Sequence, residues 1–293
     1  NRAVAEWMKA PGTQFLLDFV RPDFLLLRIL ARSLILWDEI EPTNVWIISH
    51  VPDIVYKYRL QKPTSDIIQN VDLETMNQAY CNIIAGACMA LGLKYAGTAN
   101  KNAFKILLEY AHMFTALSHK SIGELAGKST IETCLNVTLL SAAVVMAGTG
   151  NLEIMRICRQ IRTRVGPGSS VVTYGSHLTT HMALGILFLG GGRYTFSNSP
   201  SAVAALIISL FPKFPTHSND NRYHLQALRH LYVLACQPRL VLPRDIDSRM
   251  HCYATVKLTF KSNKLQKGQV TTMKAPCLLP QLESVDRVEL KDD

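Results

Sequence analysis

The sequence predicts a mainly α-helical protein built from stacked repeats, an α-solenoid or toroid of helix pairs, with a short β-rich segment at its C-terminal end. A run of Ala, Gly and large aliphatic residues ending in a glycine turn occurs three times, in residues 85–100, 138–151 and 181–193. The turn glycines are Gly97, Gly148 and Gly190, and the first interval between them is longer than the second. A recurrence at roughly 40–50 residues is typical of helical repeat arrays. Alternating polarity near the C-terminal end of the chain indicates strands.

The N-terminal part of the chain has helical periodicity followed by a connection. Residues 3–40 are divided by Pro11 and Pro22. Apolar residues recur at helical spacing within 23–40, which predicts a helix with one buried face. Prolines and polar residues in 41–72 predict a long connection. We therefore expect residues 1–72 to form a helical N-terminal segment with connecting loops.

Helical patterning returns at Leu73, and residues 73–245 are predicted to form the repeat domain. Glycine inside a helix costs roughly 0.5–1 kcal/mol relative to alanine, so its repeated use needs an offsetting gain. Close approach of neighbouring helix backbones would supply that gain. We expect small residues at close helix contacts and glycines at the turns, and the candidate structural positions are Ala90, Ala143, Ala183, Gly97, Gly148 and Gly190.

A second helix is predicted after each turn. Thr98 or Asn100 is expected to cap the first, Asn151 the second, and Ser199 with Pro200 the third. A fourth, degraded copy is predicted at 224–235. The greater length of the first interval, between Gly97 and Gly148, predicts a surface insertion near 123–130.

Strict alternation marks the C-terminal part of the chain. Cys252, Ala254, Val256, Leu258 and Phe260 alternate with more polar residues, which predicts a strand with one buried face. Residues 287–290 alternate again. We therefore expect residues 246–293 to be the start of a β-rich module.

Composition limits the class of protein. The chain has 293 residues, of which 48% are hydrophobic and 18% charged, so it is not intrinsically disordered. Its seven cysteines form no CxxC pair, which favours reduced thiols and a location in the nucleus and cytoplasm. The chain begins at Asn1, and we expect it to be a piece of a longer product.

One uncharged stretch raises the question of a membrane span. It lies between Glu132 and Glu153 and has transmembrane length. Several Thr, Ser and Asn residues dilute its hydrophobicity, and its second half is one copy of the repeat. Two buried helices are therefore the preferred prediction, with a membrane protein as the alternative.

Positive charge is unevenly distributed. The formal net charge is +9, and residues 213–264 contain nine Lys and Arg against three Asp. This excess predicts a face that contacts a partner, with Arg222 and Arg229 as candidates, although a solvated face explains it equally well. Motifs typical of nucleic-acid binding do not accompany it, so no nucleic-acid partner is predicted.

A search for chemistry finds no catalytic motif. Residues 190–193 (GGGR) lack the Lys-Ser/Thr ending of a phosphate loop. His177 and His181 share a helical face but have no HExxH glutamate and no evident third ligand for zinc. We therefore predict no catalytic residue, no metal and no cofactor, and a protein that is not an enzyme.

Four segments resemble a known family over essentially the whole chain. The small-residue runs are similar to proteasome/cyclosome repeats, which occur in two large proteasome base subunits and in the scaffold subunits of the anaphase-promoting complex. The flanking segments are more similar to the anaphase-promoting complex scaffolds, and they are residues 2–40, 145–153, 181–199 and 217–235.

The resemblance implies both a fold and a role. In that family, paired helices form a curved or closed ring that is followed by a β-containing region. The family supplies a non-catalytic scaffold in a cell-cycle ubiquitin ligase that acts in mitosis. Implied partners are the other subunits of the complex, a co-activator and a substrate-recognition subunit, in a hetero-oligomer without nucleic acid or membrane. The alternative is a proteasome base-type scaffold that binds other subunits.

Overall fold

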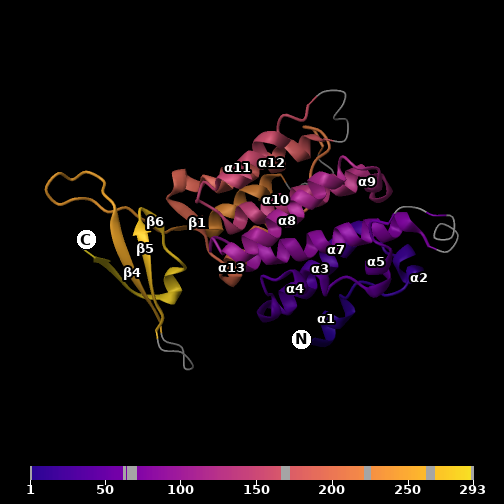
Figure 1. Cartoon of the computed structure of the whole chain (residues 1–293), viewed down its shortest axis with the longest axis horizontal. Coiled ribbons are helices and arrows are strands. Elements are labelled where there is room, and N and C mark those ends of the chain that lie inside the picture. The colour runs from indigo at the N-terminus through magenta and orange to yellow at the C-terminus, as the bar shows by residue number, and fades with distance from the viewer. Residues whose placement is uncertain are drawn as a thin grey trace.

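A computed structural model describes residues 2–61, 64, 71–165, 172–220, 226–261 and 268–291. Figure 1 shows a large helical part and a smaller strand-rich part that carries the C-terminal end of the chain. The prediction of a mainly α-helical chain with a β-rich C-terminal segment is confirmed.

The N-terminal segment contains short helices around one longer helix. These elements are α1 (Arg2–Trp7), α2 (Gln14–Asp18), α3 (Pro22–Ile35), η1 (Trp37–Glu39), α4 (Asn44–Ile48) and α5 (Asp53–Tyr58). Pro22 occupies the first turn of α3, where its missing N–H costs nothing. The helix predicted over 23–40 ends at Ile35. Residues 41–61 contain the two helices α4 and α5, so the prediction of a long connection over 41–72 is wrong for residues 41–61.

Four helices form the buried layer of the molecule. They are α3, α7 (Leu73–Lys94), α10 (Lys128–Val145) and α12 (Tyr174–Leu187), and each contacts the next. Figure 1 shows this order from α3 below to α12 above. Most residues of α7 and α10 are buried, because neighbouring helices cover them on several sides. The first two small-residue runs therefore lie largely in the core, whereas the third is partly exposed.

The second helix of each repeat lies outside this layer. These helices are α8 (Lys101–Leu117), α11 (Leu152–Ile161) and α13 (Pro200–Ser209). Their predicted caps are confirmed, since the side chains of Asn100, Asn151 and Ser199 each accept a backbone hydrogen bond from the first turn. The extra residues of the longer interval include helix α9 (Ser121–Ala126), which packs against α7 and buries Ala126.

The chain after the third turn is more irregular. It contains η3 (Leu189–Gly192), β1 (Tyr194–Phe196), η4 (Ala227–Ala235) and β2 (Cys236–Pro238). Strands β1 and β2 pair antiparallel, with Thr195 opposite Gln237. The fourth repeat copy predicted at 224–235 is a 3₁₀ helix from Ala227 onward, so in the described part of that range the prediction of an α-helical copy is wrong.

The C-terminal module has its own small core. Its main sheet has the order β5 (Val270–Ala275), β4 (Ala254–Phe260), β7 (Val285–Lys291), all antiparallel. Val256 and Leu258 of β4 are fully buried with Ala275, which confirms the buried face predicted from the alternation. The shorter elements are β3 (Leu240–Val241), β6 (Cys277–Leu278) and η5 (Leu282–Ser284).

The uncharged stretch between Glu132 and Glu153 is divided between α10, a turn and α11. Among the helices of the described residues, none has the length and hydropathy that a membrane span requires.

Candidate partner-binding surfaces

The repeat turns are joined to one another by equivalent hydrogen bonds. The N–H of Gly97 donates to the carbonyl of Val144 at 2.9 Å, and the N–H of Gly148 donates to the carbonyl of Ile186 at 3.0 Å. Val144 precedes Gly148 by four positions, and Ile186 precedes Gly190 by four. The predicted alignment of the three glycines therefore describes a real structural repeat, and each turn satisfies a carbonyl at the end of the next buried helix.

Each turn glycine has a backbone conformation that other residues rarely adopt. The φ angles of Gly97, Gly148 and Gly190 are +62°, +78° and +57°. A Cβ on Gly97 would lie 2.1 Å from the carbonyl oxygen of Phe196, and one on Gly148 would lie 2.0 Å from that of Tyr194. Strand β1 thus runs directly across two successive turns, and both turns need glycine for space as well as for φ.

The predicted small-residue contacts are also buried. Ala90, Ala143 and Ala183 are each 0% exposed, in α7, α10 and α12 respectively. A close approach between α7 and α10 involves a different residue, because a Cβ on Gly92 would lie 2.7 Å from the Cβ of Ser141. Two helix backbones can pack this closely only where one side chain is absent.

A buried arginine joins the strands to the repeat turns. Arg239 follows β2, is 2% exposed, and donates through Nη2 to the carbonyl oxygens of Gly97, at 3.0 Å, and Phe196. The side chain of Asn198 donates to the carbonyl of Lys94 at 2.9 Å. These donors satisfy carbonyls at the C-terminal end of α7, where a positive charge is also favoured by the helix dipole.

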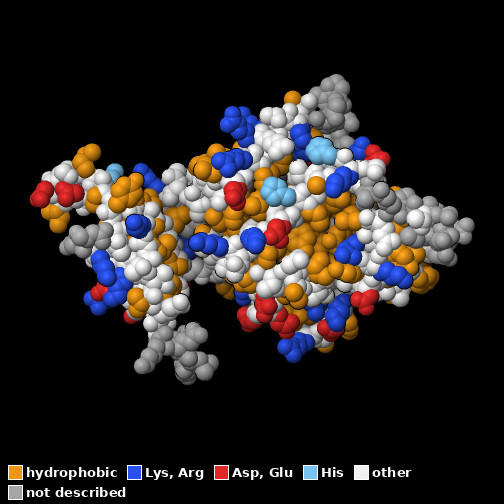
Figure 2. All heavy atoms as spheres, in the orientation of Figure 1, with side chains coloured by type: hydrophobic (Ala, Val, Ile, Leu, Met, Phe, Trp, Pro, Cys, Tyr) orange, Lys and Arg blue, Asp and Glu red, His pale blue; other side chains and the backbone are white. Residues whose placement is uncertain are grey.

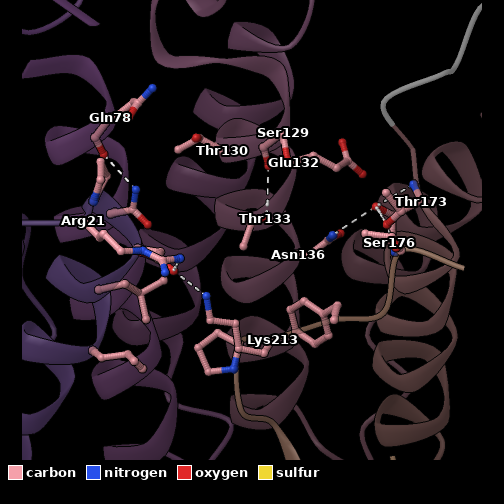
Figure 3. A pocket seen from close by; sticks show the side chains of 18 residues that line it. Arg21, Gln78, Ser129, Thr130, Glu132, Thr133, Asn136, Thr173, Ser176 and Lys213 are labelled. Atoms are coloured by element: carbon pink, nitrogen blue, oxygen red, sulfur yellow. Dashed lines mark hydrogen bonds and ion pairs between the residues drawn. The ribbon is translucent and has the colours of Figure 1, made fainter. Parts of the chain in front are cut away.

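A polar cavity of about 410 Å³ lies between the N-terminal ends of the buried helices. Figure 3 shows Gln78 of α7 on one side, Ser129 to Thr133 of α10 in the middle, and Ser176 of α12 on the other side. Lys213 reaches toward Arg21 and its neighbours from below. Half of the lining residues carry a hydroxyl or an amide and four are charged, so the cavity walls offer many hydrogen-bonding groups.

The segment after α13 closes this cavity. The carbonyl of Pro215 accepts from the N–H of Gly175 at 2.7 Å, at the start of α12. Lys213 forms an ion pair with Asp23 of α3 at 2.5 Å. Burial works to raise the pKa of Asp23, but the hydrogen bonds and charges of Lys213 and Arg21 outweigh it, so this pKa lies below its usual value. The segment therefore ties the last buried helix to the first.

The remaining charges at the cavity are engaged within the chain. Arg164 donates two hydrogen bonds to the carboxylate of Glu132, at 2.8 and 3.0 Å. The amide of Asn136 donates to the hydroxyl of Ser176 at 3.3 Å. In the described part of the chain, no three His, Cys, Asp or Glu side chains gather as they would around a metal ion.

An apolar groove of about 530 Å³ lies beside α12. Its floor is formed by α12 itself and its far wall by the chain that follows α13. The residues that line it include Leu178, Met182, Gly185, Leu189, Leu210 and Tyr232. Gly185 is exposed, and a Cβ added there would have no heavy atom within 4 Å. This part of the repeat layer is therefore open to solvent.

The two basic residues predicted to contact a partner have different outcomes. Arg222 lies outside the described residues. Arg229 is only 5% exposed and donates to the carbonyls of Ser209 and Lys213, at 3.0 and 2.7 Å. Burial lowers the pKa of its guanidinium to about 10. Its guanidinium thus holds the segment after α13 in place, and Arg229 also lines the groove beside α12, so its contact with a partner stays a prediction.

Much of the predicted basic excess is engaged in the same way. Lys213 pairs with Asp23, Lys257 pairs with Glu289 at 3.2 Å, and Arg239 is buried. Figure 2 shows the Lys and Arg side chains of the visible face spread over the molecule, whereas hydrophobic side chains gather over the middle of the helical part. Three of the basic side chains in 213–264 are therefore held by contacts within the chain.

Histidines and cysteines fit structural roles. His177 and His181 lie on α12 without a clustered third ligand in the described chain. Cys81, Cys88, Cys134 and Cys158 are buried free thiols, and burial raises the pKa of Cys81 and Cys158 to about 12. A thiol with such a pKa is protonated near pH 7 and is a poor nucleophile.

Sequence reasoning missed Arg239 and the equivalence of Gly92 with Gly185. A positive side chain in a basic stretch gives no sign of burial, so nothing in the sequence distinguished Arg239 from its neighbours. The repeat alignment did contain the signal for the two glycines. Gly92, Ala143 and Gly185 each lie five positions before a turn glycine, a correspondence that becomes meaningful once the helix contacts are known.

Comparisons with known proteins give one consistent result. The family profile described as "APC1 fifth domain" matches residues 1–237, and the one described as "APC1 beta sandwich domain" matches residues 239–293. The change from one profile to the next falls at the end of β2, next to Arg239.

Similar relatives come from distant organisms. The chain is 47% identical to "Anaphase-promoting complex subunit 1" of Homo sapiens over 293 residues, covering 99% of this chain and 15% of the human protein. It is 40% identical to the protein of the same name in Arabidopsis thaliana, covering 96% of this chain and 17% of that protein. It is 41% identical to "Negative regulator of mitosis" of Emericella nidulans, covering 99% and 14%. The chain thus spans about 15% of the length of the human relative.

Proposed function

The chain belongs to the anaphase-promoting complex subunit 1 family, and we propose that it acts within that complex as a non-catalytic scaffold. Membership of this family implies a hetero-oligomer with other subunits of the complex and a role in the cell cycle and mitosis. The proposed task of residues 1–293 is to hold partner subunits in fixed positions.

The observation that carries this proposal is the pattern of internal hydrogen bonding. Each of the first two repeat turns is bonded to the end of the next buried helix, and Arg239 bonds the start of the strand-rich module to the first of these turns. Charged groups at the central cavity are paired with one another. The polar groups of this structure mainly hold its own parts together. This use supports a role in positioning partners better than a role in catalysis.

The finer features of the role follow from the same proposal. We infer that the stacked helices are an arc of a larger solenoid or ring. The complex would act as a ubiquitin ligase, with this subunit positioning the co-activator and the substrate-recognition subunit, in the nucleus and cytoplasm. No nucleic acid or membrane enters the proposal. No observation favours the proteasome base-type alternative over this one.

A purification experiment tests the proposal. The full-length subunit, tagged, is purified from dividing cells as the wild type and as a Gly97→Val variant. We expect the wild type to bring down the other subunits, and the variant to lose several of them together. In the variant complexes that still contain every subunit, the ligase activity per complex should equal that of the wild type. Full assembly combined with loss of activity would show a catalytic contribution, and proteasome particles in the wild-type eluate would favour the alternative.

A further inference from the structure

The chain that follows α13 crosses the layer of buried helices. Residues 211–220, the strap, contain neither helix nor strand. Four of them, Pro212, Lys213, Phe214 and Thr216, line the polar cavity at the N-terminal ends of the buried helices. In Figure 3, Lys213 reaches from the strap toward the side of the cavity where Arg21 lies. The strap therefore lies where it can contact several helices at once.

An ion pair attaches the strap to the first buried helix. The Nζ of Lys213 lies 2.5 Å from a carboxylate oxygen of Asp23, in the first turn of α3. Arg21 pairs with the same carboxylate at 2.9 Å, and the side chains of Lys213 and Asp23 are both partly shielded from solvent. Because Lys213 and Asp23 are 190 positions apart in the chain, this attachment is a long-range contact.

Backbone hydrogen bonds attach the strap to the last buried helix. The N–H of Gly175 donates to the carbonyl of Pro215 at 2.7 Å, and the N–H of Tyr174 donates to that of Thr216 at 3.2 Å. Both donors belong to the first turn of α12, where N–H groups have no acceptor within the helix. A Cβ on Gly175 would lie 2.5 Å from the oxygen of Pro215 and 2.6 Å from the Cβ of Phe214, so this attachment needs the space that glycine leaves.

Internal bonds give the strap a fixed shape. The buried guanidinium of Arg229 donates to the carbonyls of Phe211 and Lys213, at 3.3 and 2.7 Å. The buried carboxylate of Asp220 accepts from the N–H of Thr216 at 2.9 Å. Such bonds restrict a segment that has no regular structure of its own, so a movement at one end of the strap is passed on to the other end.

The strap adds a connection that stacked helices do not normally have. In a repeat array each unit contacts the next, and stability is approximately a sum over neighbouring contacts. Here α3 contacts α7, α7 contacts α10, and α10 contacts α12. The strap joins α3 directly to α12, across the two helices between them. The layer can therefore change its curvature only if one of the two attachments breaks.

We propose that the strap is a conformational device that couples α3 to α12 and fixes the curvature of the four-helix layer. While both attachments are formed, α3 and α12 open to solvent as one cooperative unit. When either attachment is broken, the two helices open independently and more often. The inference goes beyond the proposed scaffold function, because it concerns the rigidity of the subunit itself and requires no partner.

Hydrogen exchange of the full-length subunit, measured by mass spectrometry, tests the coupling. Gly175→Ala displaces Pro215 from α12, whereas Gly185→Ala, in the same helix, adds a Cβ with no heavy atom within 4 Å. We expect Gly175→Ala to speed exchange about two- to fivefold in the strap and also in α3, at the other end of the layer. Gly185→Ala should leave α3 at the wild-type rate. Faster exchange in the strap with an unchanged rate in α3 would overturn the proposal, as would an unchanged strap.

The attachment to α3 provides the reciprocal test, since coupling acts in both directions. Lys213→Met removes the ion pair with Asp23 but keeps the apolar stem, and Lys101→Met makes the same change at the exposed start of α8. We expect Lys213→Met to speed exchange in the first turns of α12 by about two- to fivefold, as for the loss of a partly exposed ion pair. Lys101→Met should leave α12 unchanged. An effect of Lys213→Met that is confined to α3 would show that the strap transmits nothing.

Strand β4 is the internal reference for both experiments, because it belongs to the C-terminal module. Equally faster exchange in β4 would show that a variant destabilises the whole chain, and would count against a specific coupling. The outcomes are also separate from those of the scaffold proposal. Coupled exchange in a subunit that brings down no other subunit would support the strap and contradict the scaffold function. Full assembly with uncoupled helices would do the reverse.

Discussion

The guanidinium of Arg239 donates a hydrogen bond of 3.0 Å to the carbonyl of Gly97, a residue 142 positions earlier in the chain. The same Nη2 also donates to the carbonyl of Phe196 in strand β1. The side chain of Arg239 therefore connects three parts of the chain. These are the first repeat turn, strand β1 that crosses it, and the start of the C-terminal module. Residues 1–237 and 239–293 match different family profiles, yet this contact makes them structurally dependent.

Replacing Arg239 by Met should destabilise the chain by about 1–3 kcal/mol. The substitution keeps most of the apolar stem but removes the donor to the buried carbonyl of Phe196, and an unsatisfied buried group costs about this much. The half-buried carbonyl of Gly97 keeps a second donor, the Thr195 hydroxyl at 3.3 Å. Burial lowers the pKa of Arg239 to about 10. Urea unfolding followed by circular dichroism measures the effect.

Arg244→Met is the control for this measurement. Arg244 lies a few residues further along and is exposed. Its removal should change stability by less than about 0.5 kcal/mol, as for other surface substitutions. An Arg239→Met variant as stable as Arg244→Met would show that the buried guanidinium contributes nothing to the fold.

Gly97→Val should cost several kcal/mol, and Gly191→Val clearly less. Both glycines have positive φ, +62° and +68°, so both variants carry the strain of about 1–3 kcal/mol that this conformation imposes on other residues. Only at Gly97 does a Cβ also meet a backbone oxygen at 2.1 Å, whereas at Gly191 nothing lies within 4 Å. Thermal melts of both variants measure the difference, and equal midpoints would contradict the role given to β1.

The fold was predictable from the sequence where the pattern was local and periodic. The glycine turns, the caps at Asn100 and Asn151, and strand β4 all follow from short-range signals. The fourth copy was not predictable in the same way. Residues 227–235 keep helical hydrophobic spacing, but the chain there forms a 3₁₀ helix that packs on α13 and leads into β2, so tertiary contacts decide its form.

Alanine substitutions at Gly92 and Gly185 should have opposite effects. Gly92→Ala forces apart α7 and α10, because its Cβ would lie 2.7 Å from that of Ser141, and overpacking of this kind costs typically about 1–3 kcal/mol. Gly185→Ala meets open space and should stabilise the helix by up to about 1 kcal/mol. Chemical denaturation of the two variants measures both signs. Destabilisation by Gly185→Ala would indicate that α12 is already covered at this point.

The candidate surfaces were less predictable than the fold, for a physical reason. Sequence reasoning looked for exposed charge and selected Arg229, yet this guanidinium is buried against carbonyls of the segment after α13. Burial of a charged residue depends on long-range contacts that a single sequence does not display. The open groove at Gly185 is visible only by comparing equivalent helix contacts, which requires the structure.

Acid should weaken the closure between α3 and the segment after α13. The pKa of Asp23 is held below its usual value of about 4, against the opposing effect of burial, by Lys213 and Arg21. A carboxyl with a lowered folded-state pKa contributes stability that is fully present above its unfolded pKa and is lost as the pH falls through the lower, folded value. Because the pair is partly exposed, the loss should be below about 1 kcal/mol.

The variant Asp23→Asn isolates this contribution. At pH 7 it should be slightly less stable than the wild type, and the two proteins should converge as the pH falls through the lowered pKa of Asp23, because the wild-type carboxyl is then increasingly protonated. Asp18→Asn, an exposed carboxylate on α2, serves as the control and should keep the wild-type dependence on pH. Urea unfolding at a series of pH values measures the three curves. If Asp23→Asn and the wild type differ by the same amount at every pH, the ion pair with Lys213 does not hold the two segments together, since its contribution would have to disappear with the charge.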